Sequence, residues 1–103
     1  MKLLIVTSLK EYQKAVAEVI DHAGIEVFSV TETIGFKNDQ IPNMMDGWFS
    51  SGRELFDSIF LFSFTQNEKA EQALNLIEQF NEEHKTGFPV RAFIIPVEKT
   101  VNI

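Results

Sequence analysis

Hydrophobic residues gather in four stretches that have the length and composition of β-strands. The first, "KLLIV" at residues 2–6, is a short continuous apolar run, which is typical of a buried strand. The second spans residues 25–36 and is rich in β-branched residues. The third covers 54–65, and the fourth covers 88–97. The fourth contains two prolines, so we expect it at an edge of the sheet.

Two other stretches have the spacing of amphipathic helices. Apolar residues recur at intervals of three and four over residues 12–23 and again over 70–80. Gly24 follows the first of them, where a helix stop is expected. The segments "SLKE" and "TQNE" precede the two stretches and have capping-box spacing. We therefore expect side-chain caps from Ser8 and Thr65.

The order of these elements is β-α-β-β-α-β along 103 residues. That order predicts an α+β fold of the ferredoxin-like type, with a four-stranded antiparallel sheet and two helices on one face. The length suits one domain, residues 1–103, with a loop at about 37–53.

Both faces of the predicted sheet are apolar. In the third strand Phe56, Phe60, Phe62 and Phe64 lie on one side and Leu55, Ile59 and Leu61 on the other, and in the fourth strand Phe93, Ile95 and Val97 oppose Val90, Ala92 and Ile94. Two helices can cover only one face of such a sheet. If the second face were in contact with water, every second residue of each strand should be polar. These residues are apolar instead, so a single chain would expose a large apolar patch. We therefore expect the second face to be buried against copies of the same chain.

Composition and charge narrow the class of partner. The chain has no cysteine, a formal net charge of -6, and nine basic residues scattered among fifteen acids. A nucleic-acid-binding protein normally shows a clustered basic face, so we expect no nucleic-acid partner. The apolar run at the N-terminus is too short for a signal peptide, and no stretch has the length of a membrane span. A cytoplasmic location is expected.

No residue pattern points to catalysis, and we do not expect an enzyme. His22 and His84 are isolated near the predicted helix ends and are better explained as solvated residues than as metal ligands. Asp57 interrupts an apolar strand, but the sequence identifies no partner that would make it a general base.

The loop at 37–53 carries an unusual set of side chains for a polar segment. Met44, Met45, Trp48 and Phe49 lie within seven residues of one another. Methionine and tryptophan are favoured at adaptable contact surfaces, which predicts partner binding by these four residues. They could instead fold back onto the core. Two thioethers alone make a weak site for a soft metal.

The stretch "GIEVFSVTETIGFKN" resembles the second strand and loop entrance of the PII signal-transduction proteins. That family shows a glycine, a hydrophobic strand, Thr-Val-Thr-Glu and then Gly-Phe-Gly before its long T-loop; this chain has "SVTE" at 29–32 and "GFK" at 35–37. The element order matches over roughly residues 1–97. The related CutA proteins share the same order of elements.

The resemblance implies a homotrimer with a cleft between subunits that binds ATP, ADP or AMP. Transferred residue by residue, it places Ser29 and Thr31 near a base and Gly35, Phe36 and Lys37 near phosphates. It places Gly87 in the glycine-bearing turn after the second helix, which forms part of the same cleft. It also implies that the loop contacts a target, such as a membrane transporter or an enzyme. The family's basic segments are largely absent here, which favours a less charged nucleotide or another small anionic ligand.

Two alternatives stay open. One is a CutA-like trimer that binds a divalent or soft metal through Met44, Met45 or His22. The other is a small enzyme built on the same fold.

Overall fold

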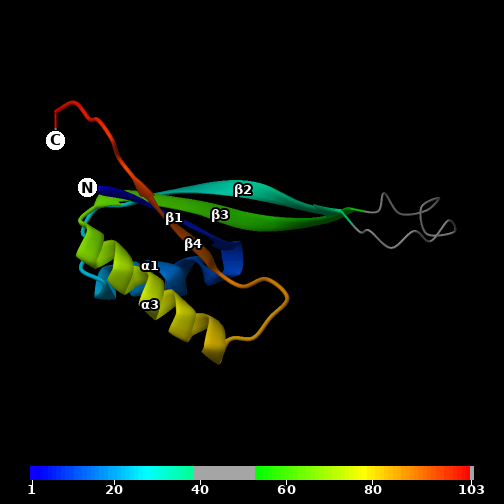
Figure 1. Ribbon diagram of the computed structural model, residues 1–103. Helices are drawn as coiled ribbons and strands as arrows, with labels where there is room; N and C mark the ends of the chain where they lie inside the picture. The colour runs from blue at the N-terminus through cyan, green and yellow to red at the C-terminus, as the bar shows by residue number, and fades with distance from the viewer. Residues whose placement is uncertain (39–52, 103) are drawn as a thin grey trace, which may run out of the picture.

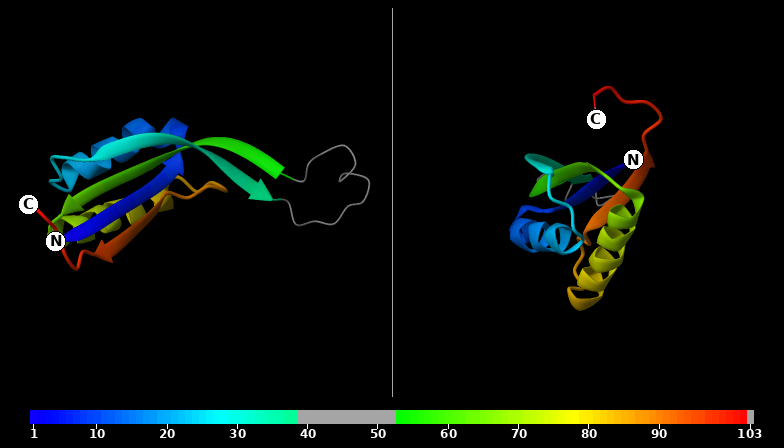
Figure 2. Two further views of the ribbon diagram at one scale, coloured as in Figure 1. Left: turned by 90° about the horizontal axis from the view of Figure 1, so that it is seen from above. Right: turned by 90° about the vertical axis from the view of Figure 1, so that its left-hand side faces the viewer.

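The computed structural model describes residues 1–38 and 53–102. They form one four-stranded sheet, with the strands in the order β2-β3-β1-β4 and every neighbouring pair antiparallel. The elements are β1 (Lys2–Leu9), the short 3-10 helix η1 (Lys10–Tyr12), α1 (Gln13–His22), β2 (Ser29–Asn38), β3 (Arg53–Thr65), α3 (Asn67–Glu83) and β4 (Arg91–Pro96). Both long helices lie on the same side of the sheet (Figure 1; Figure 2). The predicted ferredoxin-like α+β fold is confirmed.

The core lies between the helices and one face of the sheet. Leu4 and Val6 of β1, Ile20 of α1 and Leu61 of β3 are fully buried there, and Ile77 of α3 is nearly so. Removing such side chains from water is the main favourable contribution to folding. The helical stripes seen in the sequence are the faces that pack on this core.

No helix of the described residues, 1–38 and 53–102, covers the other face of the sheet, which is apolar and accessible in the single chain. We call it the open face. Its aromatic residues form a row along β3, where the ring centroids of Phe60 and Phe62 are 6.1 Å apart and those of Phe62 and Phe64 are 6.4 Å apart. Phe64 is 55% exposed, and Phe93 of the edge strand β4 is 50% exposed. The expectation of two apolar faces is confirmed.

The strands differ from their predicted bounds by two residues or more in β1, β2 and β4, and β1 ends at Leu9 rather than at residue 6. β2 begins at Ser29 rather than at residue 25 and continues to Asn38, and β4 begins at Arg91 rather than at residue 88. β4 is an edge strand, as its prolines predicted, and Pro96 is paired with Lys2 at its end. The β2–β3 hairpin extends past the helices (Figure 1). For that reason Leu55, on the helix side, is 63% exposed.

The two predicted side-chain caps are wrong. Ser8 is the partner of Ile59 in the β1–β3 ladder, and its hydroxyl donates to Leu9 O at 3.0 Å. Thr65 is the last residue of β3 and pairs with Lys2. Neither η1, α1 nor α3 has a side-chain cap hydrogen bond at its start. In both cases strand pairing has taken the residue that the local capping pattern assigned to a helix.

Gly24, two residues after the end of α1, adopts the left-handed conformation with φ at 82°. Its amide donates to Asp21 O at 3.0 Å, which completes the turn after the helix. A side chain is strained in this conformation, so we expect Gly24→Ala to lower the free energy of unfolding by about 1 kcal/mol. Gly87→Ala is the control, because its φ is not positive and no atom lies within 4 Å of an added Cβ. Urea titration would measure both; equal effects would contradict the explanation.

Candidate functional site

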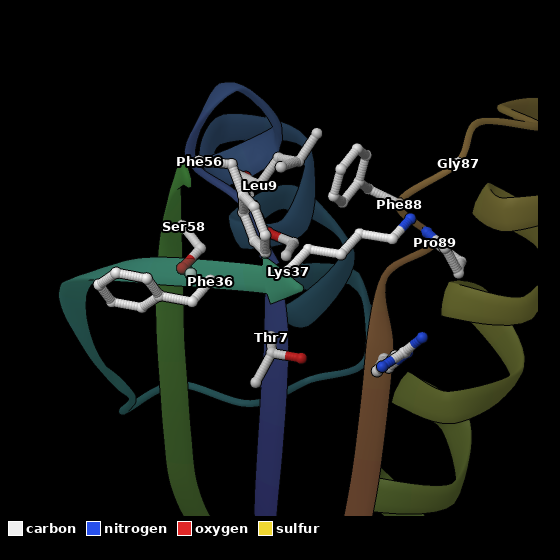
Figure 3. Close-up of a pocket in the computed structure, with 12 residues that line it drawn as sticks. Thr7, Leu9, Phe36, Lys37, Phe56, Ser58, Gly87, Phe88 and Pro89 are labelled. Atoms are coloured by element: carbon white, nitrogen blue, oxygen red, sulfur yellow. Dashed lines mark hydrogen bonds between the residues drawn. The ribbon is translucent and has the colours of Figure 1, made fainter. Parts of the chain in front are cut away.

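A cleft of about 390 Å³ lies at the end of the open face, beside the β2–β3 hairpin. Its walls come from four separate parts of the chain: the end of β1, the end of β2, the first half of β3 and the segment that leads into β4 (Figure 3). Thr7 of β1 contributes from the same side of its strand as Ile5, two residues away, which belongs to the open face. The cleft is therefore continuous with the apolar face.

One wall is the Phe56 ring, which lies directly over Gly35. These two residues are cross-strand partners in the β2–β3 ladder. A Cβ built on Gly35 would come within 2.1 Å of the Phe56 ring, so the ring fills the space that any side chain at position 35 would need. The glycine therefore serves here as the seat of an aromatic ring, an arrangement known from other antiparallel sheets.

A second aromatic ring faces the first. The centroids of Phe56 and Phe88 are 4.9 Å apart, with the ring planes tilted by 57°. The Phe88 amide donates to Thr86 Oγ1 at 3.0 Å, which closes a local turn in the segment before β4. Figure 3 shows both rings at the mouth of the cleft, with Leu9 beside them. Together they offer an apolar surface suited to a planar group.

The cleft is basic although the protein is acidic. Its charged lining residues, within the described part of the chain, are Lys37 and Arg91. The Lys37 ammonium lies 5.2 Å from the centroid of the Phe88 ring, a cation–π distance. The whole chain carries a formal net charge of -6. Two cations beside aromatic rings favour an anion that also has a planar part.

Hydroxyl groups also line the cleft. Ser58 and Thr33 are cross-strand partners whose hydroxyl oxygens are 2.6 Å apart, so one donates to the other. The Ser58 hydroxyl also lies 3.4 Å from Thr33 O. Ser58 and Thr7 both line the cleft and supply hydroxyl groups for hydrogen bonds.

Four of the six predicted ligand residues meet in this cleft. Gly35, Phe36 and Lys37 come from the end of β2, and Gly87 comes from the segment after α3. Ser29 and Thr31 lie elsewhere: they pair with Phe62 and Phe60 nearer the start of β2 and do not line the cleft. The predicted partner residues Met44, Met45, Trp48 and Phe49 fall outside the described residues.

Three further side chains that shape the cleft are not predictable as site residues from the sequence. Phe56 is predicted only as part of an apolar strand face, and no pattern marks Phe88 or Leu9 as site residues. Phe88 lies directly between Gly87 and Pro89, and Phe56 is identifiable as the partner of Gly35 once the hairpin register is known. The register was the missing signal, because it depends on the full length of both strands.

The other titratable candidates do not line the cleft, although Asp57 lies on β3 between the lining residues Phe56 and Ser58. His84 caps the end of α3, where its ring stacks on Phe80 with centroids 4.2 Å apart and its Nδ1 lies 3.0 Å from Phe80 O. His22 is exposed in the last turn of α1, and Asp57 is exposed on β3. Among the described residues no three His, Cys, Asp or Glu side chains are grouped in a way that could hold a metal ion.

Comparisons with known proteins support the fold through likeness in structure rather than in sequence. No family model and no curated protein matches the sequence. Among solved structures, the chain is similar to the crystal structure of a protein from Thermus thermophilus described as a PII-like signaling protein. The match has a TM-score of 0.55 and 20% sequence identity, and it covers 90% of this chain and 82% of the other. At that identity the likeness concerns the fold.

Proposed function

We propose that this chain is a PII-like regulatory protein that binds a small anionic ligand, of the adenine nucleotide type, in the cleft beside the β2–β3 hairpin. The observation that carries the proposal is the meeting of Gly35, Phe36 and Lys37 with Gly87 in one aromatic, basic cleft. The β2 residues are far from Gly87 in the sequence, and the four were expected together from the PII resemblance alone. The PII-like fold of the structural neighbour supports the same assignment.

The chemistry of the cleft favours a ligand with few negative charges. Phe56 and Phe88 present ring surface for a planar base, while Lys37 and Arg91 supply two positive charges. Charge-assisted hydrogen bonds to phosphate are among the strong polar contacts in proteins. Two cations balance a monophosphate well and leave a triphosphate under-neutralised. We therefore expect AMP to bind at least as tightly as ATP.

The open face supports assembly into a homotrimer. Phe64, Phe93 and Ile95 are 42% to 55% exposed in the single chain, a cost that burial against other copies would remove. Since the cleft continues this face at Thr7, a neighbouring copy packed there would come next to the ligand. This arrangement agrees with the intersubunit clefts implied by the PII resemblance.

The cleft lies next to the segment that we propose as the target-binding part of the chain. Asn38 and Arg53 are ladder partners, so segment 39–52 starts and ends at the tip of the hairpin. Lys37 lines the cleft and lies one residue before the end of β2. A ligand held at Lys37 would bias the conformations available to the segment that follows. We propose that this segment, with Met44, Met45, Trp48 and Phe49, contacts a transporter or an enzyme target.

Among the helices that the structure describes, none has the length and apolar character to cross a membrane.

Calorimetric titration with AMP, ADP and ATP tests the proposal. We expect Lys37→Ala and Arg91→Ala each to weaken binding by about tenfold or more, because each removes a charged contact worth about 1.5–3 kcal/mol. Lys85→Ala is the matched control, because it also removes a cation and lies two residues before the lining residue Gly87. The Lys85 side chain is exposed, its Nζ lies 3.8 Å from a Glu82 carboxylate oxygen, and it does not line the cleft.

Three outcomes distinguish the interpretations. Binding that is weakened by the two cleft variants and kept by Lys85→Ala supports the proposal. Equal losses in all three variants would point to non-specific attraction, and absence of binding to any of the nucleotides would overturn the proposed ligand. A parallel titration with divalent metals tests the CutA-like alternative.

A further inference from the structure

Asn81 of α3 makes an unusual contact with the chain just before β4. Its Nδ2 donates to Val90 O at 2.8 Å, and the Val90 amide donates to its Oδ1 at 2.9 Å. A side-chain carboxamide offers a donor side and an acceptor side, as a peptide group does. Asn81 therefore holds both backbone groups of Val90 in the way that a neighbouring strand would.

The contact lies where strand pairing stops. The β1–β4 ladder begins with Thr7 opposite Arg91, so Val90 is the residue immediately outside it. Val90 itself is 3% exposed and belongs to the core. Its backbone groups would be costly to leave without partners at this depth. Asn81 supplies those partners.

The residues on both sides of Val90 line the cleft. Gly87, Phe88 and Pro89 precede it, and Arg91 follows it. The other described hydrogen bond of this segment, from the Phe88 amide to Thr86 Oγ1, is local and does not tie the segment to the sheet or to α3. Arg91 is held by its ladder pairing with Thr7, whereas the position of Phe88 on the other side depends on how firmly Val90 is held.

We infer that Asn81 is a positioning residue for the cleft: its paired hydrogen bonds to Val90 set the place of Phe88 opposite Phe56 and Lys37. Asn81 does not line the cleft and would not touch the ligand. Its role in binding rests on the proposed function, whereas its control of the Phe56–Phe88 contact does not.

The test compares Asn81→Ala with Asn75→Ala. Asn75 lies on the same helix and is exposed, so the two changes have the same intrinsic effect on helix propensity. In wild-type protein, NMR should show cross-relaxation between the rings of Phe56 and Phe88, whose centroids are 4.9 Å apart. We expect Asn81→Ala to lose these signals and the exchange protection of the Val90 amide, and to weaken AMP binding about tenfold. Asn75→Ala should keep all three.

Asn81→Asp gives a second variant of nearly the same volume. Its carboxylate still accepts from the Val90 amide but cannot donate to Val90 O, so we expect partial loss of the ring signals and of affinity. It decides the matter if Asn81→Ala does not fold. Ring contacts and AMP affinity unchanged in the folded variants would overturn the inference. If wild-type protein binds no nucleotide, the proposed function fails, and the ring contacts alone decide the role of Asn81.

Discussion

Phe64→Asp is expected to dissociate the assembly into monomers. Wild-type protein should sediment at about three times the mass of its 11.8 kDa chain, if the open face is where copies meet. Phe64 lies at the end of the aromatic row and is 55% exposed in the single chain. A carboxylate placed there would have to leave water for an apolar contact, which costs far more than the lost ring contacts. We expect association to weaken at least about 100-fold.

Leu55→Asp is the matched control for this variant. Leu55 lies on the same strand, is apolar and is 63% exposed, but it points to the helix side of the hairpin. Sedimentation equilibrium of the three proteins, with circular dichroism to verify folding, gives the result. A wild-type chain that remains a monomer would contradict trimer formation. Dissociation of both variants to the same degree would show that the open face is not special.

The fold could be predicted because its signals are local and repeat along each element. Strand β3 alternates between residues such as Ile59 and Leu61, which face the helices, and Phe60 and Phe62, which do not. A period of two is preserved whatever the neighbours are. The capping pattern around Ser8 failed because a single short motif competed with a ladder of eight residue pairs, and the ladder offers more hydrogen bonds.

The candidate site was predictable only in part, for a related reason. The Gly35–Lys37 motif is contiguous, so the sequence displays it directly. The aromatic wall needs the β2–β3 register that sets Phe56 over Gly35, and the positioning contact needs α3 to bring Asn81 against Val90. Such contacts depend on which strands and helices become neighbours in the fold. For residues that belong to no motif, the order of residues along the chain does not indicate these neighbours.

Gly35→Ala is expected to break the cleft through a collision inside the hairpin. The added Cβ would lie 2.1 Å from one atom of the Phe56 ring and 2.2 Å from another, so the ring has to leave its place and with it the contact to Phe88. Overpacking of this kind costs about 1–3 kcal/mol of unfolding free energy. Loss of nucleotide binding in this variant would therefore report a displaced ring as well as any direct contact between Gly35 and a phosphate.

A double-mutant cycle separates the two roles of Gly35. If the collision is the cause, Gly35→Ala combined with Phe56→Ala should cost less stability than the sum of the single changes, with a coupling free energy of about 0.5–3 kcal/mol. Gly35→Ala combined with Phe62→Ala is the control and should be additive, because Phe62 pairs with Ser29 at the far end of the strand. Urea denaturation measures all five variants. Additivity in the first cycle would mean that the Phe56 ring does not occupy the space over Gly35 and does not form a wall of the cleft.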